Sequence, residues 1–313
     1  MRKILGRLVA AATLLLLGWI AIGGAMIALA GPVHPRGEFV DIGGRKMRIV
    51  CAGPATSRPT VVMEAGAFGL AADFGSVQEA LSAQGVRSCA YDRAGLGWSD
   101  PGPAPRDSLA IVSDLEALLK AKGENGPFIL MGHSMAGLHV RLFAARNASR
   151  VRGLVLVEAT TPEALDSVGT QRFVKAFVSI SNAAAVVASL GVLKPLTRGA
   201  DRIGLPPAAG AEKRRAFGSG RHNRTAAAEV RNWMTSAKEA GAAAAFDPDW
   251  PVAVIVAGSR GETIDSPRGA PAKAAKRGSF EVVKEAGHAS VLGAAMNGAV
   301  VRGVQFVLAH AAP

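Results

Sequence analysis

The chain has 313 residues, of which 49% are hydrophobic, and this is enough to bury one large core or two modest ones. The formal net charge is +12, but no basic run is interleaved with aromatic residues and no zinc-finger, KH or RRM signature occurs. Composition therefore predicts no nucleic-acid partner, and the charge is interpreted as a solvated surface that suits an anionic membrane face.

The first part of the chain has the pattern of a membrane segment. The basic stretch Met1–Arg7 precedes Leu8–Ala30, which carries no charge and exceeds the ~20 residues that cross a hydrocarbon core. We expect an uncleaved, single-pass anchor through residues 4–30. Its end also resembles a signal-peptidase site, so secretion after cleavage at Ala30 is the alternative. In both cases the positive-inside bias places everything after Gly31 on the extracytoplasmic side.

Beyond this segment, short apolar runs bounded by turn residues alternate with helical patterns. The expected strands are Glu38–Ile42, Arg45–Cys51, Thr60–Glu64, Val86–Tyr91, Phe128–Met131, Gly153–Val157, Val252–Ala257 and Phe280–Lys284. The expected helices are Phe74–Ala83, Leu109–Lys122, Leu138–Ala145 and Val291–Leu308. Such alternation predicts an α/β fold, with a mostly parallel sheet of eight strands and helices on both faces.

The alternation breaks between Thr161 and Asp249, where the sequence is Ala-rich, largely helical and without a clear strand. Part of this stretch, Lys194–Arg231, is basic, with nine Lys or Arg against three Asp or Glu. Because the stretch lies between two core strands, we expect a cap rather than an independent domain. The predicted organisation is a membrane segment of residues 1–31, a core of residues 32–160 and 250–313, and a helical cap of residues 161–249.

A short motif between a buried strand and a helix carries the strongest chemical signal. Residues 132–136, Gly-His-Ser-Met-Ala, are one residue away from the G-x-S-x-G nucleophile elbow, because Ala136 stands where the second Gly is usual. A strand-to-helix turn lifts Ser134 above the sheet and points a helix N-terminus at the oxygen where negative charge develops. His133 is adjacent to Ser134, and its side chain is expected to point away.

Four motifs in a fixed order give the chain a resemblance to a known family. They are Glu64–Ala67 after the third strand, Tyr91–Ser99 after the fourth, Gly132–Gly137 at the elbow, and Glu285–His288 after the last strand. From about Phe39 to the C-terminus, the chain resembles capped enzymes of the α/β-hydrolase fold. The resemblance implies a helical cap inserted after the sixth strand and a serine hydrolase that cleaves carboxylic esters.

The resemblance also implies roles for individual residues. Ser134 would attack a carbonyl carbon, and His288 would take the serine proton and later protonate the leaving group. The backbone amides of Ala67 and Met135 would form the oxyanion hole. The stretch that begins with Asp92-Arg93 is similar to the family's D-x-R-G-x-G-x-S turn, and we interpret it as structural.

The triad acid is the point at which the sequence departs from the family pattern. The usual position follows the strand that ends at Ala257, and there it falls on Gly261. Glu158 occupies the alternative family position directly after the sixth strand, and we predict it as the acid. Glu262 is the first alternative and Asp265 the second.

Cys51 and Cys89 are the two cysteines of the chain. In the fold that the resemblance implies, the second strand lies beside the fourth, and both cysteines fall at the sheet end opposite the active site. An exported domain with two adjacent cysteines favours a disulfide bond between them. No metal-binding or nucleotide-binding motif occurs, so we expect no cofactor and no metal.

Two other functions remain open at this point. An aminopeptidase of the proline-iminopeptidase kind shares the core and the cap placement, but it needs acidic cap residues to hold a substrate amino group. A non-catalytic binding protein of the hydrolase fold is favoured by Ala136 and by the displaced acid. The leading hypothesis expects a small-molecule ester as substrate, and the sequence indicates no oligomeric state.

Overall fold

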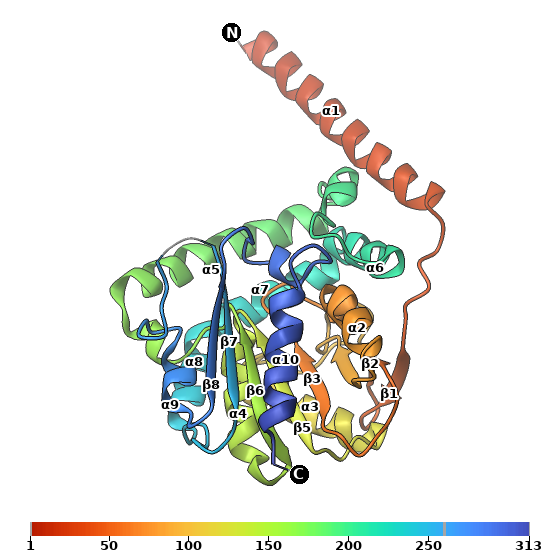
Figure 1. Ribbon diagram of the computed structural model, residues 1–313. Helices are drawn as coiled ribbons and strands as arrows, with labels where there is room; N and C mark the ends of the chain where they lie inside the picture. Colours follow the sequence, from red (N-terminus) through yellow and green to blue (C-terminus); the bar gives the residue numbers. More distant parts are fainter. Residues whose placement is uncertain (1, 259–260, 313) are drawn as a thin grey trace.

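Eight strands form one sheet at the centre of the molecule, which we describe from a computed structural model (Figure 1). The structure describes residues 2–258 and 261–312. The strands are β1 (Glu38–Asp41), β2 (Lys46–Ala52), β3 (Thr60–Glu64), β4 (Ser88–Tyr91), β5 (Phe128–His133), β6 (Val151–Val157), β7 (Val252–Ala257) and β8 (Gly278–Val283). Their order across the sheet is β1-β2-β4-β3-β5-β6-β7-β8, and only the β1–β2 and β2–β4 pairs of this described sheet are antiparallel. The predicted mostly parallel, eight-stranded sheet is confirmed.

Helices cover both faces of this sheet. The helices are α1 (Arg2–Leu29), α2 (Gly75–Ser82), α3 (Ser108–Lys122), α4 (Ala136–Arg146), α5 (Val168–Ser189), α6 (Pro207–Phe217), α7 (Gly220–Arg231), α8 (Trp233–Ala242), α9 (Ala270–Ala274) and α10 (Gly298–His310). Short 3₁₀ turns are η1 (Ala71–Phe74), η2 (Ala148–Arg150), η3 (Glu163–Asp166), η4 (Lys194–Gly199) and η5 (Ser290–Leu292). One buried apolar cluster packs α2 and α10 against the sheet, and a second packs α3 and α4 against the opposite face. Burial on both faces explains why the central strands are continuously apolar.

The segment between β6 and β7 contains four helices, α5 to α8. In Figure 1, α5, α6 and α7 cross above the edge of the sheet at which the parallel strands end. Two buried carboxylates of this segment reach arginines of the core. Glu212 on α6 lies 3.1 Å from Arg48 on β2, and Glu229 on α7 lies 2.7 Å from Arg93, just beyond β4. These ion pairs fix the inserted helices to β2 and to the turn that follows β4.

The end of the chain differs from the expected single helix over Val291–Leu308. A 3₁₀ turn, η5, is followed by a break, and α10 begins only at Gly298. At the break, a β-carbon on Gly293 would lie 1.6 Å from the carbonyl oxygen of Ile203. Close approach of the inserted segment therefore requires a glycine here, and the helical pattern read from the sequence is interrupted by this tertiary contact.

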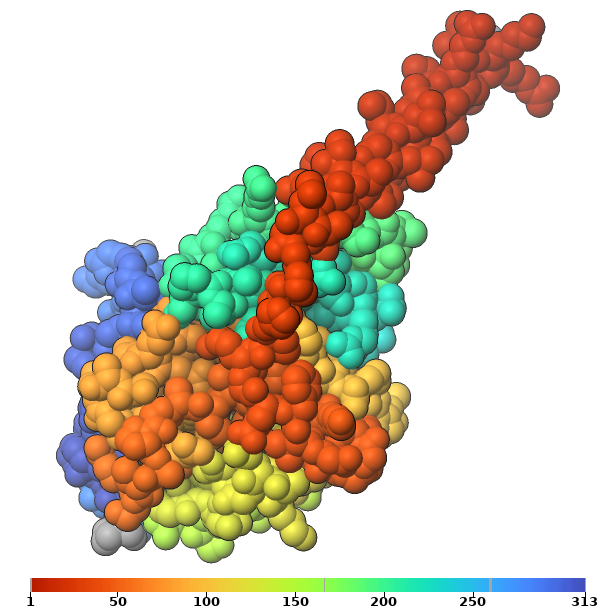
Figure 2. Space-filling model, turned by 90° about the vertical axis from the view of Figure 1, so that its right-hand side faces the viewer, coloured from red at the N-terminus to blue at the C-terminus, as the bar shows by residue number. Residues whose placement is uncertain are grey.

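Helix α1 projects away from the rest of the molecule (Figures 1 and 2). Its side chains are mostly exposed, and it contacts the globular part through its second half, where the Trp19 indole donates a hydrogen bond of 3.0 Å to the carbonyl oxygen of Val192. Among the described residues, α1 and α5 are the helices that are long and apolar enough to cross a membrane.

Cys51 and Cys89 face each other as direct cross-strand partners of β2 and β4. Their sulfur atoms lie 2.06 Å apart, so the structure joins them by a disulfide bond. Because β4 is parallel to β3 and β5, the pair lies away from the strand ends that carry the motif around Ser134.

Reduction of this bond is expected to lower the free energy of unfolding by about 2–4 kcal/mol, because the loop that it closes gains freedom in the unfolded chain. Denaturant unfolding in detergent, with and without reductant, measures the effect. A Cys51→Ser/Cys89→Ser variant is the control, because reductant should not change its free energy of unfolding. Two free thiols in the unreduced, denatured protein would contradict the bond.

His222 on α7 is a buried histidine that links three segments. Its Nδ1 accepts a hydrogen bond of 3.0 Å from the amide of Gly97, and its Nε2 donates to the carbonyl oxygen of Phe68 at 3.2 Å. Burial first, and then the charge of Lys213, lower the pKa of His222 from 6.5 to about 4. The ring is therefore neutral in the folded protein at neutral pH, and its protonation would remove the acceptor that holds Gly97.

The free energy of unfolding is expected to fall as the pH decreases from about 6.5 towards 4, because only the unfolded chain binds a proton at His222 in this range. The lowered pKa corresponds to a loss of about 3 kcal/mol over that interval. Denaturant titrations at a series of pH values measure the slope, and a His222→Gln variant should have a shallower one. Equal slopes in the two proteins would contradict the assignment.

Candidate active site

Ser134 sits on a sharp turn between β5 and α4. Its φ is 56°, a left-handed conformation that non-glycine residues rarely adopt. Two backbone hydrogen bonds hold this turn against β6 and the residues after it. The amide of Ser134 donates to the carbonyl oxygen of Val157 at 3.1 Å, and the amide of Thr160 donates to that of Ser134 at 2.8 Å. The turn thus presents the serine hydroxyl above the end of the sheet.

Two glycines allow the backbone to approach this turn closely. A β-carbon on Gly66 would lie 2.7 Å from Cβ of Ser134, and one on Gly137 would lie 2.3 Å from the carbonyl oxygen of Thr160. The close approach to the residues after β6 therefore falls on Gly137. Ala136, which replaces the usual glycine of the motif, is buried and accommodated.

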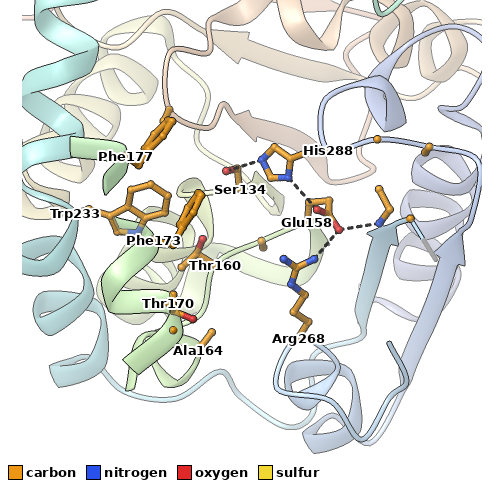
Figure 3. Close-up of a pocket in the computed structure, with 17 residues that line it drawn as sticks. Ser134, Glu158, Thr160, Ala164, Thr170, Phe173, Phe177, Trp233, Arg268 and His288 are labelled. Carbon is orange, nitrogen blue, oxygen red and sulfur yellow. Dashed lines mark hydrogen bonds and ion pairs between the residues drawn. The ribbon is translucent and has the colours of Figure 1, made fainter. Parts of the chain in front are cut away.

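The structure brings Ser134, His288 and Glu158 together in one chain of hydrogen bonds (Figure 3). Nε2 of His288 lies 2.9 Å from Oγ of Ser134, and its Nδ1 lies 2.9 Å from Oε2 of Glu158. The three residues come from the turns after β5, β8 and β6. The imidazole is about half exposed, whereas Ser134 and Glu158 are buried.

Glu158 leaves β6 in a left-handed conformation, with φ of 48°, while its amide donates to the carbonyl oxygen of Ile255 at 2.8 Å. Its Oε1 accepts hydrogen bonds from the amide of Ala257 at 2.8 Å and from Arg268 at 2.9 Å. Burial alone would raise the pKa of this carboxyl group. The hydrogen bonds from His288 and Ala257 and the charge of Arg268 outweigh burial and lower the pKa below its ordinary value.

The two alternative acids lie elsewhere. Glu262 is 4.0 Å from Nε of Arg268, and Asp265 forms an exposed ion pair of 2.7 Å with Lys273. In the described part of the chain, Glu158 is the carboxylate within hydrogen-bond distance of His288. Residues 259–260, in the loop that leads to Glu262, lie outside the described residues.

Ala67 and Met135 are the two residues whose backbone amides the sequence predicted for the oxyanion hole. Met135 precedes α4, so its amide lies at the positive end of that helix. Ala67 lies in the loop after β3, next to the close-packed Gly66, and it lines the same cavity as Ser134. Within the described residues, neither amide donates a hydrogen bond to a backbone oxygen outside regular elements.

The sequence led us to expect that the His133 side chain points away from Ser134, and this prediction is wrong: the side chain lies against the loop that carries His288. Its Nε2 donates a hydrogen bond of 2.8 Å to the carbonyl oxygen of His288, and the two imidazole rings lie 4.9 Å apart. Burial first, and then the charge of His288, lower the pKa of His133 to about 4. His133 is therefore a neutral donor at neutral pH that holds the backbone of the loop carrying His288.

A cavity of about 810 Å³ opens beside Ser134. Phe173, Phe177 and Trp233 form an apolar wall on one side, and Arg268 lies on the other (Figure 3). Phe173 stacks on Phe177 with ring centroids 5.7 Å apart. Sequence analysis identified neither this wall nor Arg268, because the contacts depend on how α5 and α8 pack over the sheet.

One group of possible metal ligands occurs in the part of the chain that the structure describes. It consists of Cys51, Cys89 and Glu124. The two sulfur atoms are already bonded to each other, so they offer no thiolate to a metal. The arrangement around Ser134 offers a hydroxyl, an imidazole, a carboxylate and two amides, which together suit acyl transfer.

Comparison with known proteins agrees with this geometry at the level of the family. A family model described as the alpha/beta hydrolase fold matches residues 59–295. The chain is 42% identical over 86 residues to an uncharacterized protein of Schizosaccharomyces pombe, which is 27% of this chain and 16% of that protein. The chain therefore spans well under two thirds of the length of this curated relative.

Solved structures with the same fold include epoxide hydrolases and an enol-lactonase. An epoxide hydrolase of Vigna radiata matches with a TM-score of 0.65 and 16% identity, over 86% of this chain and 98% of that one. The enol-lactonase of Burkholderia xenovorans matches with a TM-score of 0.57 and 19% identity, over 87% of this chain and all of that one. At such identities the likeness concerns the fold.

Proposed function

The chain belongs to the α/β-hydrolase fold family, and on that premise we propose that it is a serine hydrolase that cleaves carboxylic esters through an acyl-enzyme intermediate. The observation that carries the proposal is the pair of 2.9 Å contacts that link Ser134 to His288 and His288 to Glu158. We assign Ser134 as nucleophile, His288 as general base and Glu158 as the triad acid.

In the proposed mechanism, Nε2 of His288 takes the proton of Ser134 while Oγ attacks the carbonyl carbon of the ester. The developing oxyanion accepts hydrogen bonds from the amides of Ala67 and Met135. The imidazolium then protonates the alcohol, which leaves. A water molecule, activated by the same imidazole, releases the carboxylic acid and restores the serine hydroxyl.

Glu158 would stabilise the imidazolium that forms in each step. Its lowered pKa keeps it ionised at neutral pH, so it accepts the Nδ1–H bond throughout the cycle. Arg268 donates a hydrogen bond to Oε1 of Glu158, the carboxylate oxygen that does not contact His288, and so holds the Glu158 side chain in place. The cost of this arrangement is that Arg268 withdraws part of the negative charge that would otherwise favour the imidazolium.

Residues 161–249 act in this proposal as a cap over a core of residues 32–160 and 250–313. The apolar wall of the cavity comes largely from this cap and suits the acyl or alcohol part of an apolar ester. An aminopeptidase would need a carboxylate free to hold a substrate amino group. Glu158 is the only carboxylate among the described residues that line the cavity, and it is engaged by His288 and Arg268.

We further propose that residues 4–30 anchor the chain in a membrane as a single span, with the catalytic domain on the extracytoplasmic side. Support comes from the exposed, uncharged part of α1 from Leu8 onwards and from the basic residues Arg2, Lys3 and Arg7 that precede it. Cleavage at Ala30 would instead release the same catalytic domain as a secreted enzyme.

Replacement of Ser134 by alanine is the test of the nucleophile. The full chain in detergent should react with a fluorophosphonate probe and hydrolyse short p-nitrophenyl esters. Ser134→Ala should lose both properties while its unfolding transition stays intact, because alanine removes the hydroxyl without filling the turn. Ser149→Ala, an exposed serine of η2, is the matched control. Unchanged labelling of Ser134→Ala would refute the proposal.

The acid is tested by comparing two amide substitutions. Glu158→Gln should lower kcat by about 10⁴-fold, because a neutral partner no longer stabilises the imidazolium. Glu262→Gln removes a carboxylate that lies near Arg268 rather than His288, and it should change kcat little. Steady-state kinetics on the same soluble ester measure both. The reverse ranking would move the acid to Glu262.

A further inference from the structure

Helix α5 and turn η4 form a surface with an unusual number of exposed apolar side chains. The residues of this α5–η4 face are Val168, Phe173, Ile180, Val186, Leu190 and Leu196, each at least half exposed. Phe173 and Ile180 are seven residues apart, about two helical turns, whereas another side of α5 is buried through Val174 and Ala185. The helix thus has apolar surface on both sides, and one side has no partner among the described residues.

The same stretch is positively charged. Residues 168–200 contain Arg172, Lys175, Lys194 and Arg198 and no Asp or Glu. Apolar side chains on a helix with basic residues beside them are typical of a surface that lies in the headgroup region of an anionic bilayer. A second protein copy would instead present this same uncompensated positive charge to itself.

Helix α1 brings this face to the membrane. Besides the bond between Trp19 and Val192, a β-carbon on Gly23 would lie 2.5 Å from the ring of Pro195, so α1 packs directly on η4. Trp19 precedes Ala30, the end of the uncharged stretch, by about 16 Å along the helix. Trp19 therefore stands near the middle of the uncharged stretch Leu8–Ala30. Because η4 and the end of α5 pack on the second half of α1, α1 holds this part of the globular chain nearest to the bilayer.

The face also continues into the candidate active site. Phe173 is 58% exposed on the α5–η4 face, yet it lines the cavity beside Ser134 and stacks on Phe177. Phe177 in turn meets the ring of Trp233 edge-on at 5.9 Å. An apolar path therefore runs from the exposed face to the wall of the cavity.

We propose that the α5–η4 face lies in the surface of an anionic bilayer, and that the enzyme takes its substrate, an ester with a long acyl chain, from that bilayer. The substrate class rests on the proposed function, whereas the position of the face does not. Arg172 and Lys175 contact lipid phosphates, and the apolar side chains of the face enter the acyl region. Phe173 lies where the lipid meets the opening of the cavity.

Depth measurements test the position of the face. The two native cysteines are bonded to each other, so a cysteine introduced at residue 180 is available for labelling with a fluorophore. In full-length protein reconstituted in vesicles of phosphatidylcholine and phosphatidylglycerol, the label on Ile180→Cys should be quenched by lipids that carry nitroxides on their acyl chains. A label on Lys120→Cys, exposed on α3 near the start of β5, is the control and should not be quenched.

Equal quenching at the two positions would overturn the proposal. A second outcome would also overturn it: fluorescence of the Ile180→Cys label that changes with the protein-to-lipid ratio but is not quenched by nitroxide lipids. A second copy of the chain would then cover the face. Replacement of phosphatidylglycerol by phosphatidylcholine should weaken the quenching, since the basic residues lose their anionic partner.

Kinetics test the delivery of substrate. Ile180→Glu/Val186→Glu should lower kcat/KM for a long-chain ester carried in vesicles by at least about tenfold, because two apolar side chains no longer enter the lipid. Its activity on a water-soluble short ester should be unchanged. Phe39→Glu, which places the same charge at an exposed apolar position of β1, is the control and should retain both activities.

The outcomes separate this proposal from the proposed function. If the wild-type protein neither reacts with a fluorophosphonate nor hydrolyses the soluble ester, the catalytic assignment fails while the depth measurement remains valid. If the soluble ester is hydrolysed and the α5–η4 variant keeps full activity on vesicles, the delivery of substrate from the bilayer is refuted.

Discussion

The buried guanidinium of Arg93 is the interaction on which the geometry of the site depends. It forms ion pairs of 2.7 Å with Glu64 at the end of β3 and with Glu229 on α7, and it donates to the carbonyl oxygens of Ala65 and Gly66. One side chain thereby fixes the loop that carries Ala67 to both the sheet and the inserted helices. Because a buried charge that loses its partner is strongly destabilising, the inserted segment and the loop are held in one arrangement.

Backbone strain is concentrated where this arrangement is needed. In residues 2–258 and 261–312, the non-glycine residues with positive φ are Phe68, Ser134 and Glu158, and all three lie at the candidate site. Each such conformation costs about 1–3 kcal/mol and persists only where the surroundings enforce it. Here the backbone bonds from Ser134 to β6 and from Glu158 to β7 enforce two of them, and the carbonyl of Phe68 accepts from His222.

The sequence predicted those parts of the site that follow directly from strand ends. Ser134, His288 and Glu158 each come immediately after a strand or its turn, so the sheet determines where they meet. The preference for Glu158 over Glu262 had the same basis. The orientation of His133, the break at Gly293 and the aromatic wall could not be predicted, because each depends on contacts between segments far apart in sequence.

In the inserted segment, the net charge counted along the sequence is smaller than the positive charge of its exposed surface. Two of the three carboxylates in Lys194–Arg231 are Glu212 and Glu229, and both are buried against arginines of the core rather than paired with their own segment. Apart from Lys213, which pairs with Asp73, and Arg214, which pairs with Asp201, the basic residues of this stretch have no carboxylate partner among the described residues. The same ion pairs that fix the cap above Ser134 leave its outer surface positive, so attachment to the core and attraction to an anionic surface arise from one distribution of charge.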